Sequence, residues 1–207
     1  MLRDVRILLT ALVLAGTLAA CSPDDAPVAQ PTGSPSQVSA APTVTPVPSA
    51  SAMPSVEPVA DVTVAPERPA ALDEKPSRTG SVAVGSYFMQ LFPYASATGD
   101  LDLWNSLSDE ACEFCASTRA GVKANGDAGL HDVGGALRVL RSASREVVKD
   151  QTYSVRLDVE QSASRSVDAG GVTVKSYPGP KSLRVTLVIN WDGGWLIRGV
   201  QVDPLKS

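Results

Sequence analysis

The sequence predicts an α+β fold for residues 79–207, and three observations support this prediction. All ten aromatic residues lie at or after Tyr87, so the residues able to build a core are confined to this part of the chain. Apolar residues first recur with the helical period of 3.6, and later they alternate with polar residues as in strands. Helices followed by an antiparallel sheet are typical of α+β domains, with the helices on one sheet face.

The first helix is expected to cover the stretch around Val84 to Ala95. Its apolar residues are spaced so that they share one face, and they are Val84, Tyr87, Phe88, Leu91, Phe92 and Ala95. Pro93 should kink or end the regular part, because proline has no backbone N–H to donate. Gly99 is suited to terminate the helix, since glycine readily adopts the left-handed conformation.

Two shorter helices are expected next. Asp100 can cap a helix that contains Trp104. Ser108 can cap a third helix that begins at Asp109, because a carboxylate is favourable at the positive end of the helix dipole. The glycine-rich residues 125–135 should form a loop.

A meander of about four antiparallel strands completes the predicted domain. The expected strands are residues 136–148, 153–160, 183–191 and 195–202, and two of them alternate clearly between apolar and polar residues. The run Asp192-Gly193-Gly194 predicts a hairpin turn between the last two. The expected architecture is therefore three N-terminal helices packed on one curved sheet.

The turn after Trp191 leaves two registers open for the last strand. A two-residue turn places Arg198 inside the domain, where it would form a pocket with Trp191 and Tyr153 and would need an anionic partner. A three-residue turn with a glycine bulge places Trp195 and Ile197 inside and Arg198 outside. The second register is favoured, because burying these two side chains contributes several kcal/mol, roughly 25 cal/mol per Å².

The N-terminus predicts export and lipid attachment. Arg3 and Arg6 precede an uncharged apolar run, which is typical of a signal peptide covering residues 1–20. The sequence Leu18-Ala19-Ala20-Cys21 resembles the lipobox of bacterial lipoproteins, which implies that Cys21 is lipidated. We therefore expect a protein anchored in the extracytoplasmic face of the cell membrane by its lipid chains. An ordinary secretory signal and a membrane-embedded helix remain alternatives.

Residues 21–78 are predicted to form the lipidated end and a disordered tether. Residues 22–78 hold twelve of the sixteen prolines and no aromatic residue. Such a composition cannot bury enough apolar surface to offset the entropy of ordering. As a flexible coil it would span roughly 40 Å. A plain spacer is preferred over a proline-motif ligand for another domain.

Charge and metal-ligand counts exclude several classes of partner. Residues 79–207 carry thirteen Lys and Arg against fourteen Asp and Glu. This near-neutral balance lacks the excess of positive charge that is typical of proteins binding nucleic acid or anionic lipid. No cofactor is expected. A tetrahedral zinc site is also disfavoured, because His131 is the single histidine.

Three segments carry a resemblance to known families. The helices, the meander and the Trp191–Ile197 hairpin resemble the cone-shaped fold of the nuclear transport factor 2 superfamily. Residues 66–74, 87–100 and 107–115 are similar to an uncharacterised family of actinobacterial lipoproteins that join a lipobox, a tether and such a domain. The resemblance would extend from Pro66 to near the C-terminus. It implies a fold without an activity.

Cys112 and Cys115 are expected to form a structural disulfide, because exported thiols meet an oxidising environment. Redox catalysis is the alternative, since a helix N-terminus lowers a thiol pKa. The acidic neighbours Asp109, Glu110 and Glu113 oppose a thiolate, however.

The leading functional hypothesis is a non-enzymatic envelope lipoprotein whose domain binds a small apolar ligand or an envelope protein. An enzyme of the isomerase or hydrolase type and a dimerising assembly module are the alternatives. No catalytic residue is identified: Asp158 and Glu160 alternate with the apolar residues of their strand and should point outward, and His131 falls in the predicted loop.

Overall fold

The structure is a computed structural model that describes residues 61–205, which belong to one compact unit. The predicted signal peptide, Cys21 and most of the predicted tether lie outside the described residues. The elements in chain order are η1 (Ala70–Leu72), α1 (Arg78–Thr98), α2 (Asp102–Leu107), α3 (Glu113–Asp127), β1 (Leu130–Gly134), β2 (Leu137–Val148), β3 (Thr152–Gln161), β4 (Ser164–Asp168), β5 (Thr173–Tyr177), β6 (Lys181–Trp191) and β7 (Trp195–Pro204).

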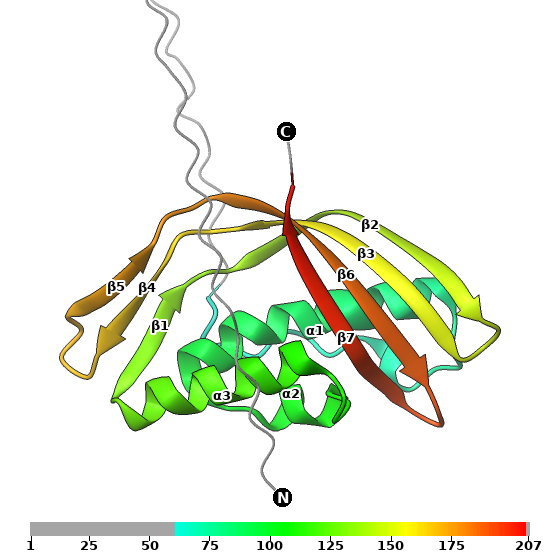
Figure 1. Ribbon diagram of the computed structural model, residues 1–207, viewed down its shortest axis with the longest axis horizontal. Helices are drawn as coiled ribbons and strands as arrows, with labels where there is room; N and C mark the ends of the chain where they lie inside the picture. Colours follow the sequence, from blue (N-terminus) through cyan, green and yellow to red (C-terminus); the bar gives the residue numbers. More distant parts are fainter. Residues whose placement is uncertain (1–60, 206–207) are drawn as a thin grey trace, which may run out of the picture. The chain divides into compact units, whose positions relative to one another are not determined.

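The strands form two antiparallel sheets. The larger sheet has the order β2-β3-β6-β7, and the smaller has the order β1-β4-β5. The long helix α1 packs against β1, β2 and β3, whereas α3 packs against β7 and β1. Figure 1 shows the helices together on the inner side of both sheets, so that no described helix covers the other side of the larger sheet.

The two sheets are joined by a bend that three chain segments share. β1 leads into β2, β3 into β4, and β5 into β6. Glycines allow the backbones to approach each other here: an ideal Cβ on Gly134 would lie 2.5 Å from the carbonyl oxygen of Ala163, and one on Gly179 would lie 2.4 Å from its nitrogen. Gly134 also has a φ of 84°, which side-chain-bearing residues rarely adopt.

The predicted fold class is therefore wrong. In place of three helices on one sheet of about four strands, the described residues form seven strands in two sheets, with one long helix of 21 residues. The unexpected strands β1, β4 and β5 are only five residues each and carry polar residues on both faces, so they lack the apolar alternation that identifies a half-buried strand. Residues 130–134 form β1, not the expected loop.

Helix α1 begins and ends through its backbone caps. The Ser77 hydroxyl oxygen accepts a hydrogen bond from the Gly80 N–H at 2.9 Å, and the helix ends at Gly99 with a φ of 76°, as predicted. Pro93 does not end the helix, which continues to Thr98. The predicted apolar face is largely buried, with Val84, Phe88 and Leu91 fully enclosed.

The starts of the two shorter helices agree only in part with the prediction. The Asp100 carboxylate accepts a hydrogen bond from the Asp102 N–H at 2.9 Å, as expected of a residue at the start of α2. Ser108 does not cap α3; its hydroxyl donates to the Trp104 carbonyl instead. α3 begins four residues later than expected, after Cys112.

The packed domain begins earlier than the predicted boundary at residue 78. Ala71 in η1 is buried, and its carbonyl accepts a hydrogen bond from the Trp195 indole N–H at 2.8 Å. The core lies between α1 and the larger sheet. Its largest fully buried side chains are those of Trp104, Tyr153, Phe88, Leu91, Leu157, Leu187, Ile189 and Ile197.

Groups from the chain itself cover part of each border of the larger sheet. At β2, the Arg78 guanidinium donates to the Ser144 carbonyl at 3.0 and 3.2 Å. At β7, the Asp109 N–H donates to the Ile197 carbonyl at 3.1 Å. Both contacts place a donor on the backbone of a border strand, where an approaching strand would otherwise pair.

Candidate ligand-binding cleft

One face of α3 lines a cleft between the helices and the smaller sheet. The residues that α3 contributes are spaced three and four apart, which places them on a single helical face. They are Phe114, Ser117, Thr118, Gly121, Val122 and Asn125. This face is half apolar and half polar, because hydroxyl and amide side chains alternate with the apolar ones.

The opposite walls come from α1 and from the smaller sheet. Phe92 and Ser96, one helical turn apart on α1, form one wall, while Asp132 of β1 and Tyr177 of β5 form the other. The cleft has a volume of about 380 Å³. This size is sufficient for a small molecule, since ligand pockets begin at roughly 300 Å³.

Among the described residues, Asp132 is the only carboxylate that lines the cleft. It is half-buried, and one of its oxygens accepts a hydrogen bond from the buried Ser166 hydroxyl at 2.6 Å. In the same row of the sheet but two strands away, Lys175 of β5 places its ammonium 4.8 Å from the centre of the Tyr177 ring. A ligand can therefore meet one fixed negative charge and one aromatic face.

Packed aromatic rings hold the other end of the cleft in place. The Phe92 and Phe114 rings lie 6.4 Å apart, and both contact Trp104, which stacks on Phe88 at 4.2 Å. Such aromatic pairs contribute about 0.5–1.5 kcal/mol each beyond their burial. The cleft wall on α1 and α3 is therefore preorganised by the core.

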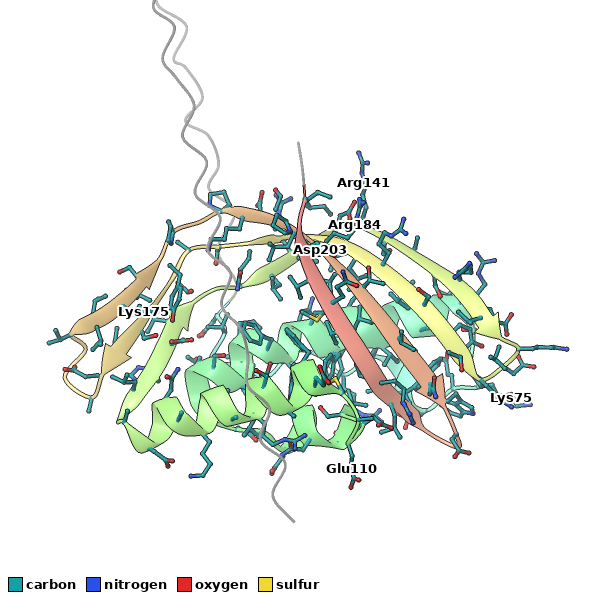
Figure 2. The ribbon with its side chains drawn as sticks, viewed as in Figure 1. Lys75, Glu110, Arg141, Lys175, Arg184 and Asp203 are labelled. Carbon is teal, nitrogen blue, oxygen red and sulfur yellow. A yellow bond between two sulfur atoms is a disulfide. The ribbon has the colours of Figure 1, made fainter. Side chains whose placement is uncertain are left out.

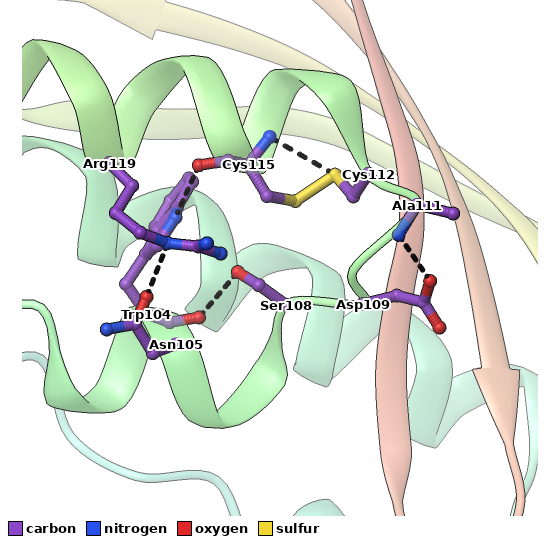
Figure 3. The surroundings of a disulfide bond; sticks show 8 residues. All are labelled: Trp104, Asn105, Ser108, Asp109, Ala111, Cys112, Cys115 and Arg119. Atoms are coloured by element: carbon purple, nitrogen blue, oxygen red, sulfur yellow. Dashed lines mark hydrogen bonds between the residues drawn. A yellow bond between two sulfur atoms is a disulfide. The ribbon is translucent and has the colours of Figure 1, made fainter.

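The disulfide between Cys112 and Cys115 fixes the start of the cleft-lining helix (Figure 3). Cys112 is the N-cap of α3, and its sulfur accepts a hydrogen bond from the Cys115 N–H. The Cys115 carbonyl in turn accepts from the Trp104 indole N–H at 3.2 Å. Both cysteines are buried, which favours the structural role over redox catalysis.

His131 cannot act together with Asp132. The two are neighbours on β1, so their side chains point to opposite faces of the smaller sheet. His131 is exposed and lies opposite Val167 in the register, whereas Asp132 lies opposite Ser166. The single histidine is thus outside the cleft.

Of the predicted pocket residues, Trp191 and Tyr153 both contact the Trp195 ring, whereas Arg198 does not join them. Trp191 pairs with Trp195 across a three-residue turn, which is the favoured register. Trp195 and Ile197 are buried, and Arg198 is exposed with its guanidinium 3.1 Å from the Asp109 carboxylate. Tyr153 is buried against Trp195, and burial raises the pKa of its phenol.

The two carboxylates on β3 point outward, as their alternation predicts. Asp158 pairs with Arg184 at 2.7 Å, and Glu160 pairs with Arg138 at 2.9 Å. The hydrogen bonds from Arg184 hold the pKa of Asp158 below its usual value, although burial opposes this shift. Both carboxylates lie on the sheet face opposite the cleft.

Sequence reasoning missed every residue of the cleft. The signal available for α3 was the spacing of Phe114, Val122 and Asn125 on one helical face. Tyr177 and Asp132 carried no signal, because their strands were not recognised. Within residues 61–205, no group of three acidic, histidine or cysteine side chains suits a metal ion, and no helix is long and apolar enough to cross a membrane.

Comparison with known proteins identifies a family and shows a distant likeness to solved structures. A family described as "Family of unknown function (DUF6318)" matches residues 57–201. The crystal structure of the intermembrane space region of chloroplast protein ARC6 is similar, with a TM-score of 0.50 and 12% identity over 64% of this chain and 100% of that chain. This identity is informative about the fold alone. No curated protein matches the sequence.

Proposed function

The chain belongs to DUF6318, a family of unknown function, and we propose that it is a lipid-anchored protein of the cell envelope whose cleft binds a small ligand without turning it over. The anchor is Cys21, and the predicted tether carries the binding domain away from the membrane. The cleft between α1, α3 and the smaller sheet is the observation that supports the binding role.

The lining of the cleft favours an amphipathic ligand rather than the purely apolar one expected from the sequence. Phe92, Phe114 and Tyr177 offer apolar surface, while Asn125 and Asp132 offer hydrogen-bonding groups. A sugar ring fits this pattern, because it presents C–H groups on its faces and hydroxyl donors around its rim. Asp132 favours neutral or amino sugars over acidic ones, since a carboxylate repels a second negative charge.

Enzymatic use of the cleft is less consistent with its lining. General acid–base catalysis needs an ionisable group in reach of the substrate, and hydrolysis of a sugar commonly uses two carboxylates. The cleft lining contains Asp132 as its single carboxylate, with no amine or imidazole. We therefore propose binding rather than chemistry.

The ligand proposal can be tested with the chain from residue 21 onward, carrying Cys21→Ser so that it stays unlipidated. Thermal shift and titration calorimetry would compare neutral, amino and acidic sugars. We expect neutral or amino sugars to bind, with an affinity loss of about tenfold or more for Asp132→Asn, because one hydrogen bond to a charged group is lost.

The matched control is Asp127→Asn, which changes the same charge at an exposed position on α3 outside the cleft. Its affinity should equal that of the wild type. Failure of all three sugar classes to bind, or equal binding by Asp132→Asn, would contradict the ligand proposal.

The anchor is tested separately by metabolic labelling of the full chain with an alkyne fatty acid. We expect label on the wild type and none on Cys21→Ser. Unlabelled wild-type protein, or protein recovered from the cytosol, would refute the lipoprotein proposal and would leave the ligand experiment unaffected.

A further inference from the structure

The outer face of the larger sheet carries a cluster of arginines that form no ion pair within the described residues. We define the arginine triad as Arg141 and Arg145 on β2 with Arg156 on β3. All three side chains are exposed. Within residues 61–205, none of the three forms an ion pair. Figure 2 shows Arg141 extending away from the helices.

The strand register brings these three arginines close together. Arg156 lies opposite Ala143, which is two residues from each of the other two arginines. Diagonal neighbours of this kind have Cα atoms about 7–8 Å apart, within reach of long side chains. Arg156 repels both Arg141 and Arg145, so the face gains from an anionic partner.

The acidic groups on this face are already committed or remote. Asp158 lies directly opposite Arg141 in the register, but its carboxylate accepts from Arg184 through both oxygens, at 2.7 and 3.0 Å. Glu160 pairs with Arg138. Asp203 lies three strands away from Arg141 in the same row of the sheet. The charges of Arg141 and Arg156 add to the lowering of the Asp158 pKa, after the larger effect of Arg184.

Exposed aliphatic side chains surround the arginine triad. Leu140, at a bulge of β2, is 41% exposed, and Val148, at the end of β2, is 47% exposed. Val188 on β6, in the row of Arg145 and Ser154, is 42% exposed. Arginines together with scattered aliphatic side chains suit the headgroup region of an anionic bilayer, which attracts basic groups and accepts short apolar ones.

We propose that the outer face of the larger sheet docks on an anionic phospholipid surface through the arginine triad. An acidic protein segment is the other partner that arginines suit, but it gives no role to the exposed Leu140, Val148 and Val188. The near-neutral net charge of the domain gives no sign of this basic face, because most acidic residues of the domain lie on other surfaces. This contact goes beyond the anchor at Cys21 and does not depend on it.

Vesicle sedimentation tests this proposal with the Cys21→Ser chain from residue 21 onward, which cannot bind through acyl chains. Vesicles of phosphatidylcholine with about 30% phosphatidylglycerol carry the negative potential that attracts basic residues. We expect sedimentation with these vesicles, little with pure phosphatidylcholine, and weakening by salt, since exposed charges are screened. Each arginine should contribute about fivefold in partitioning.

The test variant replaces Arg141, Arg145 and Arg156 with Gln and should lower partitioning about 100-fold. The matched control replaces Lys75, Lys123 and Lys175 with Gln, which removes the same charge from other surfaces. Lys75 and Lys175 lie away from this face in Figure 2. Circular dichroism would show that both triple variants are folded.

Three results would overturn the proposal. The first is equal sedimentation with neutral and anionic vesicles, and the second is an equal loss in both triple variants. The third is binding of polyglutamate to the arginine triad without binding to vesicles, which would identify an acidic protein as the partner.

Discussion

The bend between the two sheets predicts a large cost for Gly134→Ala. An alanine there must adopt a left-handed φ, at about 1–2 kcal/mol. Its Cβ would also lie 2.5 Å from the Ala163 carbonyl oxygen, a backbone atom that cannot move without shifting β4. Overpacking of this kind adds about 1–3 kcal/mol. The expected loss of unfolding free energy is therefore about 2–5 kcal/mol.

Urea denaturation followed by tryptophan fluorescence would measure this loss. Gly129→Ala is the control, because Gly129 also has a positive φ, 68°, but its Cβ would meet nothing within 4 Å. Gly129→Ala should lower the unfolding free energy only by the cost of placing alanine in the left-handed conformation, about 1–2 kcal/mol. Equal losses for the two variants would refute the argument that close backbone approach makes the bend depend on glycine.

Three further predictions concern single contacts. Replacing Cys112 and Cys115 together by Ala should lower the unfolding free energy by only about 2 kcal/mol, because a disulfide that closes so short a loop restricts the unfolded chain little. Calorimetry that shows no change would contradict this. Trp195→Phe removes the hydrogen bond to η1 and should cost about 1–2 kcal/mol, and amide exchange in residues 70–72 should rise while that in β3 should not. Because Arg184 holds the Asp158 pKa below its unfolded value, this carboxylate stabilises the fold above an unfolded pKa of about 3.9, and the contribution disappears as pH falls through the lower folded pKa. Asp158→Asn should therefore reduce the loss of unfolding free energy between neutral and acidic pH. An unchanged pH dependence would show that Asp158 does not contribute to this loss.

Strong periodicity made some elements predictable from the sequence. The apolar stripe of α1 and its Gly99 terminus agree with the structure, as do β2, β3, β6 and β7 within a few residues. The hairpin register also followed from the sequence, because exposing Trp195 and Ile197 would cost far more than exposing Arg198.

Long-range contacts decided the elements that could not be predicted. Strands β4 and β5 contain polar residues such as Lys175, and they are ordered because β4 pairs with β1 on one side and with β5 on the other. The start of α3 depends on the Cys112 sulfur as its cap rather than on Ser108. The cleft was hidden for the same reason, since its walls are separated by more than 80 residues between Phe92 and Tyr177.

The contacts that Arg78 and Asp109 make at the two borders of the larger sheet limit how molecules of this protein can associate. A strand arriving from another copy would meet a guanidinium on β2 or the α2–α3 connection on β7 before it met free peptide groups. Crowding on a surface would then bring domains together without fusing their sheets into a continuous ribbon.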